Sequence, residues 1–159
     1  MVYLYSILGL IAFLAAVFFV GKFWADAYRK RELKRAYLDF RHRREQLEAR
    51  FFDLARSLGK PRGLRWIDCN WQDRVTFGRD RNTGMLTAFV GVNISFEAIE
   101  GEDMEGVAAV GTIREAAALF HYQYGNWGTG GRALFNMDPD AALERLKDQY
   151  ESIGFHPAG

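Results

Sequence analysis

The sequence has 159 residues, of which 49% are hydrophobic and 26% are charged, and this composition is typical of a folded protein and unlike that of a disordered or fibrous chain. Its single cysteine excludes an internal disulfide and a zinc site built on paired cysteines. The formal net charge of +1 is the sum over an uncharged start, a basic stretch and an acidic remainder. We therefore divide the sequence into three segments: 1–23, 24–59 and 60–159.

The first segment has the pattern of a membrane anchor. Residues 2–21, VYLYSILGLIAFLAAVFFVG, form a run of 20 residues without a charge. At about 1.5 Å per residue, such a helix spans the roughly 30 Å hydrocarbon layer of a bilayer, so we predict a single transmembrane helix over 1–23. Aromatic and basic residues stand where membrane-interface anchors are expected: Tyr3, Tyr5, Lys22, Trp24, Tyr28, Arg29, Lys30 and Arg31. A cleaved signal peptide, with the small residues Ala25 and Ala27 at the cleavage site, and a buried core helix are the alternatives.

The charges around this run predict its orientation. Between residues 22 and 50 there are ten Lys or Arg and five Asp or Glu, and no basic residue precedes the run. The positive-inside rule then places the N-terminus outside and the C-terminal domain in the cytoplasm. The basic cluster predicts attraction to anionic lipid headgroups, and no nucleic-acid partner is expected. Small residues at helical spacing could let membrane helices pair: Ser6, Gly9, Ala12 and Ala16.

The second segment, 24–59, is predicted to be a long basic amphipathic helix. It contains no Pro or Gly before Gly59, and Pro61 follows. Alternating spacings of four and three define a coiled-coil-like seam that only Arg44 interrupts: Leu33, Tyr37, Phe40, Leu47, Phe51, Leu54 and Leu58. Two interpretations stay open, because the aromatic residues and Arg44 suit a two-stranded coil poorly. The later half docks on the chain's own domain, or the seam pairs chains into a homo-oligomer; both can hold if 33–40 pairs chains.

The third segment, 60–159, is predicted to be a small antiparallel α+β domain: a meander of four to five strands followed by a C-terminal helix. The expected strands are Leu64–Trp71, Arg74–Arg79, Met85–Glu97, Arg114–Tyr124 and Arg132–Met137, with a turn at Arg81–Gly84. A helix over 139–153 is expected from Asp138 as N-cap and Pro139 behind it. This order of helix and meander resembles that of cystatin-like folds, in which a curved sheet wraps a helix; the resemblance implies topology and no function.

Two loops are candidate contact surfaces. The glycine-rich stretch 125–131 could cradle an anion, but it precedes a strand and is better explained as a hairpin tip that exposes Trp127 to a partner. Five carboxylates crowd residues 97–105, and their spacing does not match a calcium loop. We interpret them as a solvated loop in which Glu100, Glu102 and Asp103 could meet a basic partner or a weakly bound cation.

Catalytic signals are weak. Cys69 and His121 fall on predicted strands and could form a thiol–imidazole dyad only if the fold brings them together. Strand alternation would put Trp66 and Asp68 on one face, as a pocket wall or as a core tryptophan with a polar neighbour. No histidine pair has metal-ligand spacing, so we expect no metal, cofactor or catalytic residue.

These patterns favour a membrane-anchored, non-catalytic interaction or scaffold protein that displays an α+β domain to an unknown protein partner at the cytoplasmic face. The alternative is a tethered ligand-binding or enzymatic domain with a pocket between sheet and helix. A homo-oligomer formed through the membrane helix and the stalk is the third hypothesis.

Overall fold

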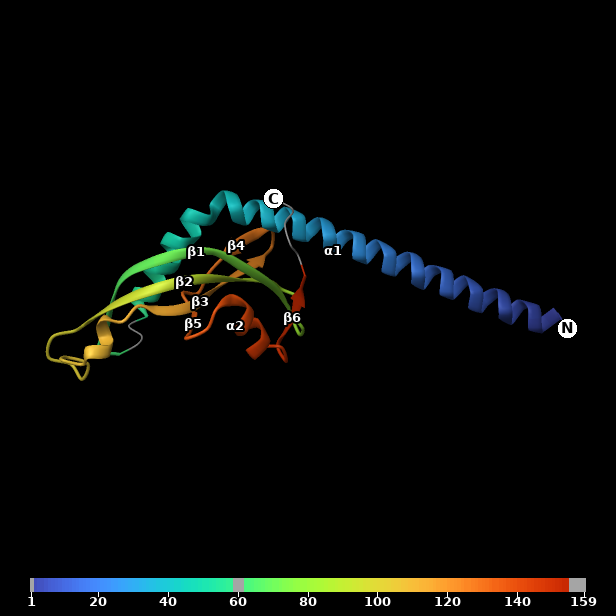
Figure 1. Cartoon of the computed structure of the whole chain (residues 1–159). Helices are drawn as coiled ribbons and strands as arrows, with labels where there is room; N and C mark the ends of the chain where they lie inside the picture. The colour runs from blue at the N-terminus through green and yellow to red at the C-terminus, as the bar shows by residue number, and fades with distance from the viewer. Residues whose placement is uncertain (1, 59–61, 155–159) are drawn as a thin grey trace. The chain divides into compact units, whose positions relative to one another are not determined.

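The computed structural model describes residues 2–58 and 62–154, and leaves the side chains of residues 2–8, 10, 12, 108 and 109 outside that description. It is an α+β structure with a long N-terminal helix, α1 (Val2–Ser57), and a short C-terminal helix, α2 (Pro139–Arg145) (Figure 1). The chain divides into two compact units, an N-terminal unit ending at Leu38 and a C-terminal unit beginning at Asp39. This boundary lies inside α1, whereas the sequence suggested a boundary near residue 60.

The N-terminal unit is helical from Val2 and exposes many large apolar side chains. From Ile11 onward these are Ile11, Phe13, Leu14, Val17, Phe18, Phe19, Val20, Phe23, Trp24, Tyr28 and Leu38. The basic residues of the predicted interface, Lys22 and 29–31, are also exposed. Within the part of the chain that the structure describes, no helix is both long and apolar enough to cross a bilayer. The side chains of Tyr3, Tyr5, Ser6 and Ala12 lie outside the described residues, and the anchor over 1–23 stays a prediction.

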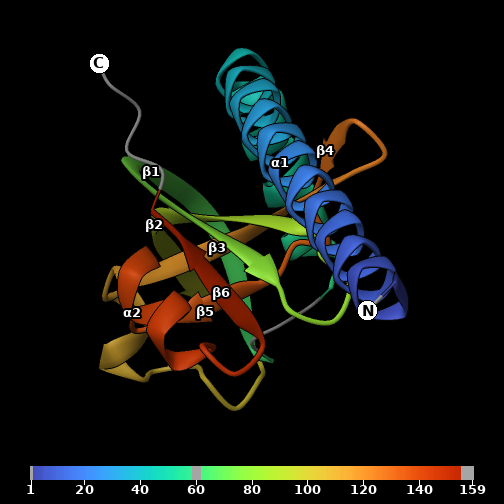
Figure 2. The same ribbon diagram turned by 90° about the vertical axis from the view of Figure 1, so that its right-hand side faces the viewer.

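The C-terminal unit is built on an antiparallel sheet, which in the described residues has six strands, one more than the most we predicted. They are β1 (Leu64–Asp80), β2 (Leu86–Ala98), β3 (Arg114–Gln123), β4 (Asn126–Gly128), β5 (Ala133–Phe135) and β6 (Tyr150–Ile153). The order is β4-β3-β2-β1-β6, and β5 pairs with β3 beyond the end of β4. The predicted meander is therefore confirmed from β1 to β3. β4 lies in the stretch that was predicted to be a hairpin tip, and β6 lies beside β1 at the other edge (Figure 2).

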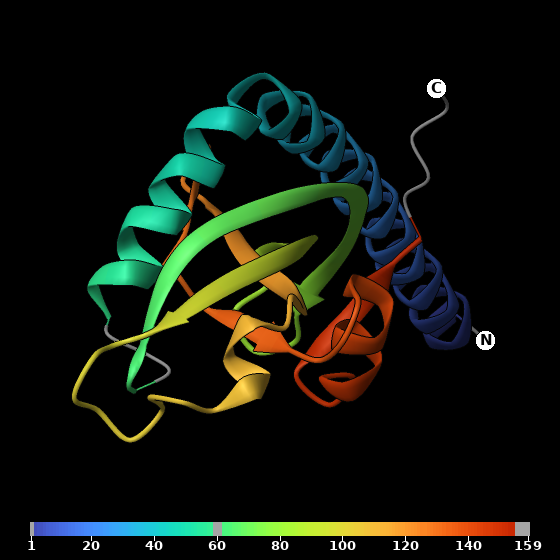
Figure 3. The ribbon, with the colours of Figure 1, turned by 60° about the vertical axis from the view of Figure 1, so that its left-hand side comes forward.

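β1 is one strand of 17 residues where two shorter strands were predicted. It stays continuous through two register shifts against β2, between Trp66 and Asp68 and between Trp71 and Val75, and it curves strongly (Figure 3). The extra residue of a bulge reverses the alternation of side chains. Trp66 pairs with Phe96 and Asp68 with Ser95, so the prediction that Trp66 and Asp68 share a face is wrong.

One face of the sheet packs against residues 39–57 of α1. The even-numbered residues of β2 predicted to share a face, Val90, Val92, Ile94 and Phe96, are buried. Phe51 meets the rings of Trp66, Trp71 and Phe120 at centroid distances of 6.2, 5.3 and 5.8 Å. Figure 3 shows the last turns of α1 running along the curved sheet.

Phe40 contacts the same face, with ring centroids 6.3 Å from Phe77 and 5.7 Å from Phe120. Phe40, Leu47 and Phe51 are therefore buried on the chain's own sheet, in agreement with the docking interpretation. If both interpretations held, residues 33–40, which include Phe40, were expected to pair chains. The burial of Phe40 on its own sheet shows that this expectation is wrong for Phe40. Leu54 is half-buried and Leu58 is 56% exposed, while Leu33 and Tyr37 belong to the N-terminal unit.

The opposite face packs on α2 through Phe89, Ala117, Leu119, Ala142, Leu143 and Tyr150. The predicted N-cap is confirmed, because the Asp138 carboxylate accepts a hydrogen bond from the Ala141 amide at 2.8 Å. The predicted helix to residue 153 is wrong beyond Arg145. The chain turns at Leu146 (φ −102°, ψ 21°) and Tyr150 starts β6. Burial of the Tyr150 ring against Phe89, at 5.4 Å, favours the strand over more helix.

The glycine-rich stretch, predicted as a hairpin tip, begins with a tight hairpin turn and continues into β4. Tyr124 and Gly125 both have positive φ, 51° and 79°, as a two-residue type I′ hairpin turn requires. Trp127 is only 5% exposed, because its pairing with Tyr122 turns it onto the face that α1 covers, where its ring lies 5.0 Å from Phe40. The expected exposure of Trp127 is wrong, and it presents no free surface to a partner.

Candidate functional site

A cavity of about 220 Å³ lies at one end of the sheet, where β1 and β3 begin and β2 ends. It is lined by Leu64, Phe96, Met104, Val110, Arg114, Phe135 and Asn136. The Trp66 ring separates it from the helix-covered core: Trp66 meets Phe51 on one side, and on the other meets Phe96 at 5.1 Å and Phe135 at 6.2 Å. The cavity is therefore a continuation of the aromatic core that side chains do not fill.

Two polar residues are among those that line this largely apolar space. Arg114 is half-buried and opens β3 opposite Ile94, on the face that α1 covers farther along the sheet. Asn136 follows β5 with a left-handed φ of 59°, fixed by the hydrogen bond from its amide to the Glu115 carbonyl at 2.8 Å. Of the lining residues, Arg114 alone carries a charge.

The loop after β2 supplies the outer wall. The Ile99 amide donates to the Gly63 carbonyl at 3.0 Å, and the Gly101 amide donates to Glu105 Oε2 at 2.8 Å. Gly63 has a φ of 73°, which favours glycine, and a Cβ there would lie 2.9 Å from Met104 Cγ. Met104 thus packs down toward the cavity, and its unbranched side chain can adjust at little cost.

The acidic residues of this loop are exposed, as predicted: Glu97, Glu100, Glu102, Asp103 and Glu105. Glu97 pairs with Arg65 at 3.3 Å. Among the described residues, no three potential metal ligands come together. Contact of Glu100, Glu102 and Asp103 with a partner stays a prediction.

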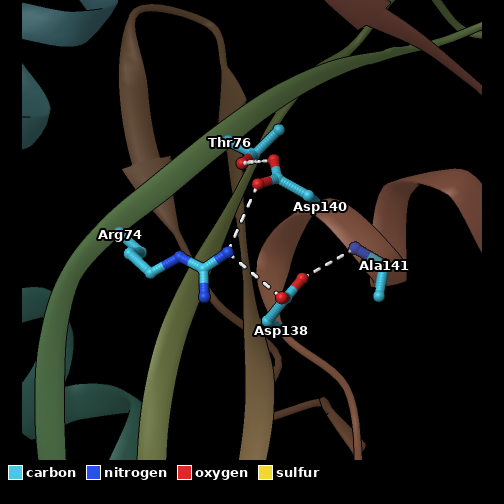
Figure 4. A network of polar contacts seen from close by, with 5 residues as sticks. All are labelled: Arg74, Thr76, Asp138, Asp140 and Ala141. Carbon is cyan, nitrogen blue, oxygen red and sulfur yellow. Dashed lines mark hydrogen bonds and ion pairs between the residues drawn. The ribbon is translucent and has the colours of Figure 1, made fainter.

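The start of α2 is tied to β1 by a polar network (Figure 4). The Arg74 guanidinium lies 3.1 Å from Asp138 and 3.4 Å from Asp140, and the Thr76 hydroxyl donates to Asp140 at 2.6 Å. The Ala141 amide and then the Arg74 charge hold the pKa of Asp138 below its ordinary value. Each carboxylate in this network is satisfied, so it fixes α2 in place and is not a site of chemistry.

A groove of about 330 Å³ runs beside α2, and its charged lining groups also have partners. The Lys147 ammonium lies 2.9 Å from Glu144, and Arg81 Nε donates to the Lys147 carbonyl at 3.1 Å. It is less apolar than the first cavity, and these contacts hold the turn after α2 in place.

The fold separates the predicted thiol–imidazole pair. Cys69 lies opposite Ile94 and His121 opposite Thr87, seven residues apart along β2, which is roughly 23 Å at 3.3 Å per residue. The two side chains also take opposite faces of the sheet. Burial, and then Asp68, raises the pKa of Cys69 to about 12, so this thiol is not an activated nucleophile. His121 Nδ1 lies 3.1 Å from the Thr87 hydroxyl, and burial lowers its pKa.

Arg44, which interrupts the predicted seam, has a role that the heptad pattern did not reveal. Its Nε lies 2.7 Å from Glu48, and Nη2 donates to the Gln72 carbonyl at the second bulge of β1. The guanidinium thus satisfies a carbonyl that the register shift removes from the ladder. The sequence signal for this role was the position of a charged residue within an otherwise apolar helix face.

No protein family, curated protein or solved structure matches the chain.

Proposed function

We propose that this chain is a membrane-anchored, non-catalytic interaction protein, held in the bilayer by residues 2–21 and carrying its α+β unit at the cytoplasmic face. The observation that carries the proposal is the uncharged run of 20 residues followed by ten basic residues between 22 and 50. Exposure on the helix supports it: Phe18, Phe19 and Phe23 are 67%, 69% and 74% exposed. Side chains of this kind on several sides of a helix need an apolar solvent or a partner.

The non-catalytic part rests on the separation of the two residues that could have formed a dyad. Cys69 is a protonated thiol at neutral pH, and His121 contacts Thr87 on the other face. The exposed acidic loop, and an excess of fifteen acidic over eleven basic residues in 51–159, support a basic partner surface. Homo-oligomer formation through the membrane helix and the stalk stays a proposal that concerns the residues before Asp39.

Alkaline carbonate washing of membranes from cells expressing the full chain tests the anchor. The protein is expected to stay in the pellet, and Leu14→Arg with Phe18→Arg is expected to release it, because each arginine costs about 3 kcal/mol near the bilayer centre. Ala49→Arg, on an exposed position of the same helix, is the matched control and should not. Release of the unmodified protein, or a mature N-terminus near Tyr28, would overturn the anchor.

Thiol labelling tests the orientation. Cys69 is half-buried with a pKa near 12, so a reporter is better placed at the exposed turn residue Asn82 in a Cys69→Ser background. Asn82→Cys should resist a membrane-impermeant maleimide in intact cells and react after permeabilisation. Reaction in intact cells would place the α+β unit outside.

A second candidate function, a tethered ligand-binding domain, is favoured by the cavity at the open end of the sheet. An apolar space with one charged side chain and one amide is the usual composition of a small-molecule site.

A further inference from the structure

We propose that one face of α1, between Phe23 and Arg35, binds a single anionic phospholipid, with the lipid phosphate at Arg31 and the upper part of the acyl chains against Phe23. A groove of about 330 Å³ marks this face, and it is lined by Phe23, Trp24, Ala27, Tyr28 and Arg31. The site rests on the proposed membrane anchor and names its lipid partner. The basic stretch attracts anionic headgroups in general, whereas the groove holds one of them.

The groove forms where a small residue stands among aromatic ones. Successive residues of a helix are about 100° apart around its axis, which places the half-buried Ala27 between Phe23 and Trp24. These two rings and that of Tyr28 are 74%, 73% and 71% exposed. Trp and Tyr favour the headgroup region of a bilayer, because their apolar rings each carry a polar hydrogen-bond donor. With residues 2–21 in the bilayer, the groove lies where a phospholipid changes from acyl chain to headgroup.

Along the helix axis, this face turns from apolar to basic in the same direction as a phospholipid does. Val20 stands on it before the groove, and the basic residues that stand on it at the groove or after it are Arg31, Lys34 and Arg35; all four side chains are exposed. Helical side chains lean toward the N-terminus of their helix, so the groove beside Ala27 is within reach of the Arg31 side chain, which lines it.

The charges on this face favour an anion. Lys34 and Arg35 flank Arg31 about one turn farther on, and within the described residues none of these three side chains forms an ion pair. The acidic Asp26 and Glu32 lie roughly 100–140° from Arg31 around the axis. A guanidinium offers phosphate oxygens two parallel N–H donors, which suits the phosphodiester of a lipid.

The same face is unsuited to packing against a second copy of the chain. Leu33 and Ala36, the buried positions of this stretch, lie roughly opposite Arg31 around the axis. In a parallel pair of anchored helices joined through the groove, Arg31 of one copy would face Arg31 of the other, and like charges in contact disfavour such a dimer. A lipid phosphate brings the opposite charge to the same place.

Native mass spectrometry of the full chain in an uncharged detergent, titrated with dioleoyl phosphatidylglycerol or dioleoyl phosphatidylcholine, tests the site. One phosphatidylglycerol should bind at least about tenfold more tightly than phosphatidylcholine, and Arg31→Gln should weaken it by about tenfold. Arg29→Gln removes the same charge from an exposed position on the other side of the helix and should leave this binding nearly unchanged. Ala27→Phe, which fills the groove, should abolish the preference, whereas Ala25→Phe, at an exposed position outside the groove, should not.

The contrary outcomes separate the lipid site from the anchor. Equal losses in Arg29→Gln and Arg31→Gln, or an Ala27→Phe variant that keeps the preference, would show a diffuse attraction and overturn the site. A dimer that Ala27→Phe dissociates would make a second copy the occupant and overturn the lipid. A protein that stays in the carbonate-washed pellet but binds both lipids equally loses only this site, whereas release of the unmodified protein overturns the anchor and the site together. Circular dichroism shows whether the helix is intact in each variant, and the two arginine variants decide the matter if Ala27→Phe disrupts it.

Discussion

Replacing Phe51 by alanine is the sharpest test of whether α1 docks on its own sheet. Phe51 is fully buried, and its ring meets Trp66, Trp71 and Phe120. Truncating such a side chain removes its transfer free energy and leaves a cavity that the rigid aromatic neighbours can fill only in part. The expected loss is about 3–5 kcal/mol in the free energy of unfolding. Because Trp66 and Trp71 are in contact with the ring, guanidinium unfolding of the full chain in mild detergent can be followed by tryptophan fluorescence.

Leu58→Ala is the matched control, since Leu58 belongs to the same predicted seam but is 56% exposed. It should change the free energy of unfolding by no more than about 0.5 kcal/mol. Sedimentation should give the same oligomeric state for both variants and the unmodified protein. A Phe51→Ala variant that keeps its stability but loses an oligomer would refute the docking argument, because it would show that the seam joins chains.

Three further predictions concern the C-terminal unit. Gly131→Ala should destabilise it by roughly 1–3 kcal/mol, because Gly131 has a φ of 69° and a Cβ would lie 2.8 Å from the Ala55 backbone nitrogen; equilibrium unfolding measures this, with Gly130→Ala as a tolerated control. Asp138→Ala should cost about 1 kcal/mol at pH 7 through the lost N-cap. The pKa of Asp138 is lowered from its ordinary 3.8. The stability that the ionised carboxylate contributes is therefore present above pH 3.8 and is lost as the pH falls through the lower pKa of the folded protein. Unfolding measured from pH 7 to pH 2 should show that Asp138→Ala loses less stability than the unmodified protein below about pH 4. Cys69, with its pKa raised to about 12, should react with a thiol reagent at pH 8 far more slowly in the folded than in the unfolded protein.

Each of these has a contrary result. Equal stability of the two glycine variants would mean that α1 does not approach residue 131 closely. If Asp138→Ala and the unmodified protein lost the same free energy of unfolding between pH 7 and pH 2, another carboxylate would account for the acid sensitivity of the fold. Equal labelling rates in both states would mean that Cys69 is not shielded by the sheet.

Much of the sheet was predictable, because strand alternation is a local property. Val90, Val92, Ile94 and Phe96 follow a period of two, and Asp138 with Pro139 marks a helix start that needs no tertiary information. The hairpin at Tyr124 and Gly125 was also foreseeable from its glycine density.

The predictions that were wrong concern features set by contacts between residues that are far apart in the sequence. A bulge at Ile67 is set by the pairing of β1 with β2, and no local pattern shows it. Residues 146–153 have helical spacing, but Tyr150 is buried against Phe89, about sixty residues earlier in the chain, and the chain forms β6 instead. Trp127 looks exposed beside four glycines, but its pairing with Tyr122 turns it inward. The candidate cavity was not predictable either, since Leu64, Val110 and Phe135 come from separate elements.

The basic stalk and the α+β domain, which the sequence divides near residue 60, overlap in the structure. Residues 39–57 supply Phe40, Leu47 and Phe51 to the core, and Arg44 binds the bulged carbonyl of Gln72. A heptad seam and one apolar face of a docked helix share the same spacing, so periodicity alone cannot separate them. The composition of the face can: aromatic residues and a central arginine pack poorly between two identical helices, but they fit a curved sheet that offers tryptophan rings and an unpaired carbonyl.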